Sequence, residues 1–63
     1  MDHTELRRGN KVMFFDWATN PPQTLVGKIV GVPDRDMPYM FEIVGSDGSR
    51  SVVNSDRILM KLD

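Results

Sequence analysis

Hydrophobic positions along the chain fall into five short runs that are separated by glycine, proline and small polar residues. Each run is rich in β-branched or aromatic residues, which is typical of β-strands bounded by turns. No segment shows the helical repeat of apolar positions over the length of a normal helix. The pattern therefore predicts five short strands, at residues 11–15, 25–32, 39–44, 50–53 and 58–62.

Turn signals between the runs predict how the strands connect. Asn-Pro-Pro at 20–22 indicates a loop, because two prolines remove ladder donors and the residue before a proline is extended. Gly27 and Gly31 lie inside the second run and predict a bulge or a tight bend. Asp-Gly at 47–48 predicts a hairpin turn, and the capping residues at 54–57 predict one tight helical turn before the last strand.

These elements indicate the fold class. Five short strands with regular turn signals and no helix are typical of a small barrel or sandwich, and the element order is that of an SH3-like barrel. A chain of 63 residues has room for one domain. We predict a flexible N-terminal lead-in over residues 1–8 and an all-β, five-stranded SH3-like barrel over residues 9–63, with one short 3₁₀ turn before the last strand.

Composition narrows the class of protein further. Hydrophobic residues make up 40% of the chain and charged residues 27%, values that are typical of a folded globular domain. The net charge of −1 provides no global basic field for nucleic acid or an anionic membrane. The chain has no cysteine, which excludes disulfides and thiolate chemistry and favours a cytoplasmic location. A small core without a disulfide also favours a homo-oligomer or an obligate partner.

Membrane association and export are not expected. The N-terminal segment is polar and has no apolar stretch behind it, and no apolar run approaches the ~20 residues of a membrane span. Enzymatic activity is not expected either, because the chain lacks a P-loop, a dinucleotide-binding glycine motif and a nucleophile elbow. The single histidine, His3, lies in the lead-in, where partners for catalysis or metal binding are rarely held in place. We therefore predict no catalytic residue, no metal site and no cofactor.

Four segments resemble small SH3-like barrels of the Tudor and KOW type, over a stretch from about Gly9 to the end of the chain. They are Gly9-Asn10-Lys11-Val12, Gly27-Lys28-Ile29-Val30-Gly31, Tyr39-Met40-Phe41-Glu42 and Leu59-Met60-Lys61-Leu62. A small bacterial Tudor-like family is similar over the second half, through residues 37–42, the Asp-Gly turn and the final Leu-x-Lys-Leu. These are framework residues, so the resemblance implies a fold more than a function.

The segments at 9–12 and 27–31 also resemble the plasmid-borne type II dihydrofolate reductases, which are tetramers of a similarly short barrel. That family lines its pore with Val-Gln-Ile-Tyr, whereas this chain has Ser51-Val52-Val53-Asn54. The functional lysine of the family falls on Phe14 here, and the first loop is longer. No catalytic residue is therefore carried over, and a reductase-like tetramer is the last of three hypotheses.

Aromatic residues lead to the first hypothesis, a small bacterial or mobile-element regulator or adaptor that binds a protein partner. Alternation along the first strand puts Val12 and Phe14 inside and Phe15 outside, with Trp17 on the same side as Phe15. A groove at the mouth where the first loop and the next connection meet would suit an extended peptide or a cationic side chain. Equally, Trp17 could plug one end of the barrel or lie in a homo-oligomer contact. The predicted binding residues are Phe15, Trp17 and Tyr39, with Asp16, Asp34 and Asp36 as complements to a basic ligand.

Basic residues lead to the second hypothesis, a nucleic-acid-binding barrel of the Tudor or KOW type. Small barrels of this kind bind nucleic acid through aromatic residues and scattered cations. The patch is modest, and acidic residues outnumber the basic ones. Its candidates are Arg7, Arg8 and Lys11 near the first strand and Arg50 and Arg57 near the last turn.

Overall fold

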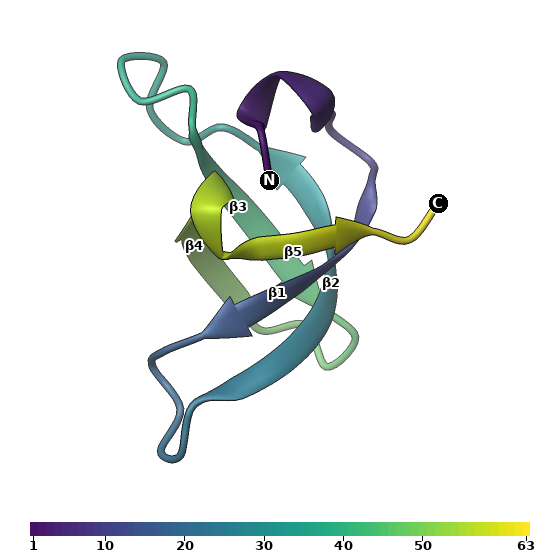
Figure 1. Ribbon diagram of the computed structural model, residues 1–63, viewed down its shortest axis with the longest axis vertical. Coiled ribbons are helices and arrows are strands. Elements are labelled where there is room, and N and C mark those ends of the chain that lie inside the picture. Colours follow the sequence, from purple (N-terminus) through teal and green to yellow (C-terminus); the bar gives the residue numbers. More distant parts are fainter.

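The computed structural model describes residues 1–63 and contains one sheet of five antiparallel strands (Figure 1). The strands are β1 (Lys11–Asp16), β2 (Gln23–Gly31), β3 (Met40–Gly45), β4 (Arg50–Asn54) and β5 (Ile58–Lys61). Two 3₁₀ turns, η1 (His3–Glu5) and η2 (Ser55–Arg57), are the only helical elements. The all-β prediction is confirmed, including the single turn before the last strand. No helix of the molecule has the length and apolarity needed to cross a membrane.

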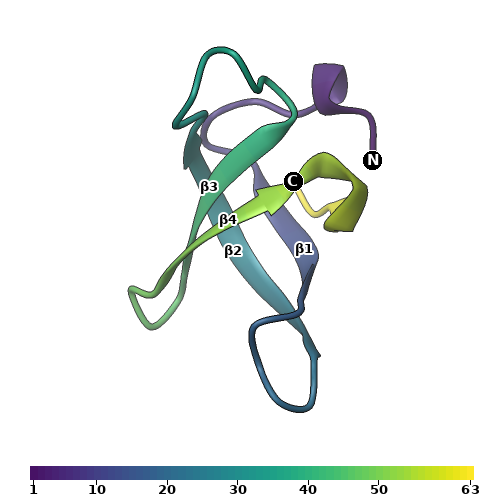
Figure 2. The same ribbon diagram turned by 90° about the vertical axis from the view of Figure 1, so that its left-hand side faces the viewer.

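The sheet is strongly bent but open. Its strand order is β4-β3-β2-β1-β5, and β4 and β5 are its two edges because no pairing joins them. The term barrel therefore holds only in the loose sense of a sheet that curves around one core (Figures 1 and 2). The predicted irregularity in the second strand is present, because the register of β2 with β3 shifts between Ile29 and Gly31.

The hydrophobic core lies on the concave face of this sheet. Alternate residues of each strand point inward, so β1 buries Val12 and Phe14 while Met13 between them faces outward. Every strand contributes to the same cluster, and apolar side chains fill the space between the two ends of the bent sheet. The other buried apolar residues are Leu6, Ile29, Phe41, Ile43, Val53 and Ile58.

Residues 1–8 differ from the flexible lead-in that the sequence predicts. Leu6 is only 3% exposed and belongs to the core, and Met1 packs against it. Asp2 caps η1 by accepting hydrogen bonds from the Thr4 amide at 3.0 Å and the Thr4 hydroxyl at 2.9 Å. These bonds, the amide bond first, lower the pKa of the Asp2 carboxyl. Because a single leucine in a polar segment has no periodicity, the sequence pattern did not reveal this contact.

The hairpin between β3 and β4 has the predicted Asp-Gly turn. Gly48 has φ of 85°, a left-handed conformation that favours glycine. The Asp47 carboxylate accepts hydrogen bonds from the Ser49 hydroxyl at 2.7 Å and the Ser49 amide at 3.0 Å. These two bonds, the hydroxyl bond first, lower the pKa of Asp47. Turn chemistry therefore sets the register of this hairpin.

Candidate binding surfaces

The most exposed aromatic side chain, Trp17, lies directly after β1 and is 59% exposed. The ring of Phe15 packs against it edge-on, with 4.8 Å between ring centroids and an interplanar angle of 72°. The guanidinium carbon of Arg57 lies 5.6 Å from the centroid of the Trp17 ring, within cation–π range. We call Phe15, Trp17 and Arg57 the Trp17 cluster.

Strand register brings these three residues together. Phe14 lies opposite Ile58 of β5, and both are buried, so the alternate residue Phe15 faces outward, as predicted. Because Arg57 immediately precedes Ile58, it arrives beside the end of β1. Asp16 shapes the loop that follows, since its carboxylate accepts a hydrogen bond from the Ala18 amide at 2.8 Å. The cluster thus combines an exposed aromatic surface with a guanidinium group.

Tyr39 does not share a loop mouth with Trp17, which corrects the predicted groove. The β1–β2 loop and the β2–β3 connection lie at opposite ends of the molecule in both views (Figures 1 and 2). Successive connections of an antiparallel sheet alternate between its two ends. The β1–β2 loop and the β2–β3 connection are successive, so they lie apart. The carbonyl of Tyr39 instead accepts a hydrogen bond from the Ser55 amide at 2.8 Å, so Tyr39 lies beside the first residue of η2.

Two of the predicted acidic residues belong to that distant connection. The Asp34 carboxylate accepts a hydrogen bond from the Asp36 amide at 2.9 Å and so stabilises the connection itself. Both residues are exposed at the end of the molecule opposite to the loop of Trp17. The acidic residues predicted to surround the aromatic side chains therefore do not lie together. The charged group that contacts Trp17 is the basic side chain of Arg57.

The predicted basic residues are also dispersed. The Arg7 guanidinium donates to the carbonyl of Thr4 at 2.7 Å and to that of Leu6 at 3.1 Å, so it stabilises the N-terminal segment. Arg57 lies on Trp17, in a different place again. Only two of the five predicted cations, Lys11 and Arg50, line the same surface.

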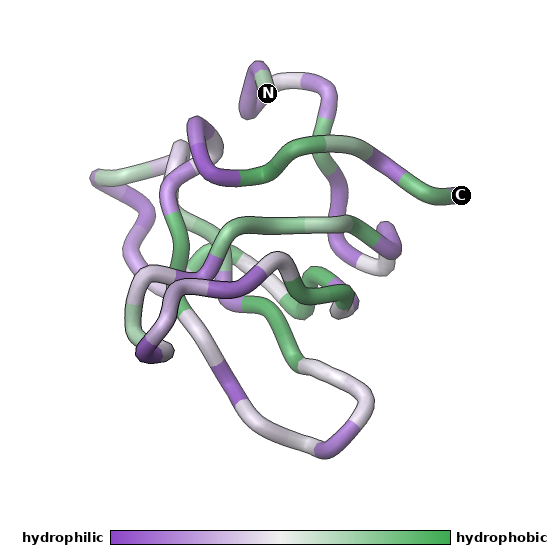
Figure 3. Tube along the Cα trace, turned by 60° about the horizontal axis from the view of Figure 1, so that its bottom comes forward, coloured by the Kyte–Doolittle hydropathy of each residue, from purple (hydrophilic) through white to green (hydrophobic).

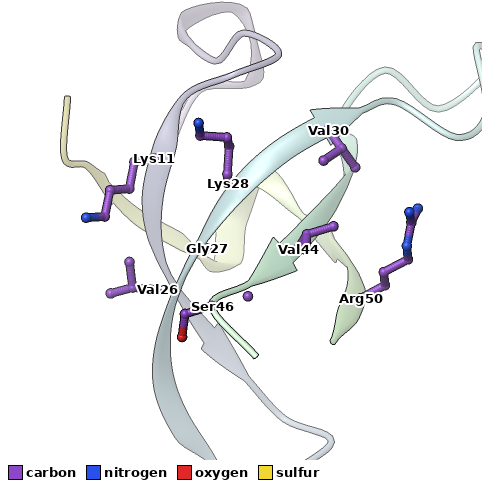
Figure 4. Close-up of a pocket in the computed structure, with 9 residues that line it drawn as sticks. Lys11, Val26, Gly27, Lys28, Val30, Val44, Ser46 and Arg50 are labelled. Atoms are coloured by element: carbon purple, nitrogen blue, oxygen red, sulfur yellow. The ribbon is translucent and has the colours of Figure 1, made fainter. Parts of the chain in front are cut away.

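That surface is a hollow of about 660 Å³ on the convex face of the sheet, which we call the basic hollow. Lys11, Lys28 and Arg50 carry its positive charge, with valines between them (Figure 4). The sequence interpretation missed Lys28, although its place between the inward positions Gly27 and Ile29 marks it as outward-facing. What the sequence pattern did not reveal was that Lys28 pairs directly opposite Lys11.

An apolar edge is the third exposed surface. β5 is an edge strand, and three apolar residues on it or directly after it are exposed, namely Leu59, Met60 and Leu62. Figure 3 shows the hydrophobic character of the chain along this strand as it approaches the C-terminus. Met60 lies opposite Met13, which in turn lies opposite Val26, so an apolar row crosses the convex face from this edge.

The structure holds no cluster of three or more His, Cys, Asp or Glu side chains that could bind a metal ion. His3 contacts Asp2, with 3.8 Å between Nδ1 and the carboxylate oxygen. At the position of the functional lysine of the reductase family, Phe14 is buried in the core. No family model, no curated protein and no solved structure matches this chain.

Proposed function

We propose that this chain is a non-enzymatic interaction module of the SH3-like, Tudor or KOW type, which binds a protein partner through the Trp17 cluster. The observation that carries the proposal is the exposure of Trp17, the largest aromatic side chain of the molecule. Tryptophan and arginine are enriched among the residues that dominate the energy of protein interfaces. Here they lie in contact on one surface.

Contacts within the cluster favour binding because they restrain both side chains before a partner arrives. Phe15 packs against Trp17 edge-on, and Arg57 lies over the same indole ring. Less side-chain entropy is then lost on association. The ring already has a cation from its own chain, so we infer a partner different from the basic ligand that the sequence suggested. It would place an apolar side chain on Trp17 and a carboxylate or carbonyl oxygen on the Arg57 guanidinium.

Tyr39 would extend this surface along η2, since Tyr39 lies beside Ser55 at one end of that turn and Arg57 is at the other. The module would act as a small regulator or adaptor that presents Trp17 as an exposed anchor. We place it in the cytoplasm on the absence of cysteine.

Affinity capture from a lysate of the source organism tests this function. Wild-type protein, Trp17→Ala and Val52→Ala are immobilised, and retained proteins are identified by mass spectrometry with and without nuclease. Val52 is a matched control because it is also exposed and apolar but lies on β4. We expect one partner that resists nuclease, is retained by Val52→Ala and is lost with Trp17→Ala.

Thermal denaturation must show that Trp17→Ala stays folded, which we expect because the side chain is mostly exposed. Equal retention by Trp17→Ala and wild type would refute the proposal. Retention that disappears with nuclease would show that the principal ligand is a nucleic acid instead.

We also propose that two copies associate through the apolar edge. Leu59, Met60 and Leu62 expose apolar surface on a strand that has only one pairing neighbour. A second copy could pair with this strand by its own identical edge, giving a symmetric dimer. Light scattering of wild type and Met60→Lys tests the dimer. A concentration-independent monomer for the wild type would rule it out.

A further inference from the structure

We infer that the basic hollow binds the phosphate backbone of double-stranded nucleic acid without reading its sequence. This surface is separate from the Trp17 cluster, and the inference does not depend on a protein partner. Lys11, Lys28 and Arg50 come from three different strands and line one hollow of about 660 Å³.

Strand register aligns these three cations in a row. Lys11 lies opposite Lys28, Lys28 lies opposite Val44, and Val44 lies opposite Arg50. Neighbouring strands are about 4.8 Å apart, so the row crosses four strands with charges at its first, second and fourth positions. Figure 4 shows the two lysines on one side of Val44 and Arg50 on the other. A linear row of cations complements a linear array of phosphates.

Two like charges directly opposite each other destabilise an antiparallel pair. The molecule has only two ion pairs, His3 with Asp2 and Arg50 with Glu42, so neither lysine side chain forms an ion pair. The Asp63 carboxylate lies near Lys11, but it accepts its hydrogen bond from the Lys11 backbone amide, at 3.1 Å. An anion bound between Lys11 and Lys28 would relieve this repulsion. The Arg50–Glu42 pair, at 3.2 Å, is largely solvent-exposed on the arginine side and would cost little to rearrange.

The surroundings of the row favour nucleic acid over an acidic peptide. The strands at the centre of the hollow, β1, β2 and β3, each have a neighbour on both sides, so none of them offers a free strand edge to an extended peptide. Phosphates need only cationic side chains. The floor contains Val26, Val30 and Val44 and no aromatic ring on which a base could stack, which favours a duplex backbone over a single strand.

Fluorescence anisotropy with a labelled 20-base-pair duplex of arbitrary sequence, between 50 and 200 mM KCl, tests the inference. Three phosphate contacts give a slope of about −2.7 in log affinity against log salt, which is about a 40-fold loss over this range. The double variant Lys11→Gln with Lys28→Gln should reduce the slope to about −0.9. Arg substitutions at both positions should retain binding. A second duplex of different sequence should bind equally well.

The matched control is Arg8→Gln with Arg35→Gln, which removes the same charge from exposed residues outside the hollow. It should bind like the wild type, and so should Trp17→Ala. The inference is overturned if no duplex binds at 50 mM KCl or if the control variant loses as much affinity as the lysine variant. Tighter binding of a polyglutamate peptide than of the duplex would also overturn it, because an acidic protein would then be the better ligand.

Discussion

The two faces of the bent sheet follow different rules. On the concave face, every strand contributes buried apolar side chains, such as Val12, Ile29 and Ile43, to one cluster. On the convex face, the alternate positions of the same strands hold lysines, an arginine and partly exposed apolar residues. The buried side chains that the strands place on the concave face are therefore all apolar, whereas the side chains of the convex face are both charged and apolar.

This difference separates folding from binding. A small sheet has one face to bury, and the volume and shape of the inward residues decide whether it folds. The outward residues contribute little to that core, so they can carry charge and exposed aromatic groups at small cost. Both proposed ligand surfaces, the Trp17 cluster and the basic hollow, use outward positions. Substitutions on the two faces should therefore have very different effects.

The largest effect is expected from the centre of the concave face. Ile43→Ala removes a fully buried side chain and should lower the free energy of unfolding by about 2–5 kcal/mol. That loss is comparable to the total stability of a domain this small, so the variant should be largely unfolded at 37 °C. Urea denaturation followed by circular dichroism measures it. Val52→Ala, on the convex face and 50% exposed, should cost less than about 0.5 kcal/mol. Similar losses for the two variants would contradict the separation of the faces.

A smaller effect is expected at Gly27 of β2, where β3 leaves no room for a side chain. A Cβ at Gly27 would lie 2.6 Å from a methyl carbon of Ile43 and 2.8 Å from the carbonyl oxygen of Val44. Gly27→Ala should therefore cost about 1–3 kcal/mol by overpacking, as measured by thermal denaturation. Gly31→Ala is the matched control, because a Cβ there meets no atom within 4 Å. If both variants unfold at the same temperature, the strands are not in close contact at Gly27.

On the convex face, removing a charge should raise stability. Lys28→Gln relieves the repulsion from Lys11 and should stabilise the protein by up to about 1 kcal/mol at low salt. The gain should disappear in 1 M salt, where exposed charges are screened. Arg8→Gln, an equal change of charge outside the hollow, should have no such effect. A gain that persists in 1 M salt would show that repulsion between the lysines is not its cause.

The smallest effect concerns the β3–β4 turn. Hydrogen bonds from Ser49 lower the pKa of Asp47, so the charged carboxylate favours the folded state at neutral pH. This contribution is complete above the ordinary pKa of an unfolded aspartate, about 3.9, and is lost as the pH falls through the lowered pKa. NMR titration should show a lower pKa for Asp47 in the wild-type protein than in the Ser49→Ala variant. Equal midpoints would show that Ser49 does not stabilise the carboxylate.

The strands of the sheet could be predicted well because each has a local signal in the sequence. An apolar run rich in aromatic residues marks β1, and the Asp-Gly turn marks the β3–β4 hairpin, so element type and approximate bounds could be inferred. Leu6 was missed because one apolar residue in a polar segment has no pattern. The open sheet edge was missed because closure depends on whether β4 and β5 meet, which no local signal reports.

The candidate surfaces were harder to predict because they depend on register and on the direction of the loops. Lys28 is significant only because it lies opposite Lys11, and Arg57 only because η2 ends beside β1. Tyr39 was placed beside the loop of Trp17, although consecutive connections of an antiparallel sheet leave from opposite ends. The outward direction of Phe15 was correct, since it follows from alternation alone.

Solution NMR gives the most direct test of the claim that a protein partner binds at the Trp17 cluster. The captured partner is titrated into ¹⁵N-labelled protein, and chemical-shift changes are mapped onto the strands. We predict the largest changes at the Trp17 indole N–H, the Arg57 side chain and the Phe15 amide, with small changes at buried positions such as Ile43. Changes confined to other surfaces, with the Trp17 indole unmoved at saturation, would contradict the proposal.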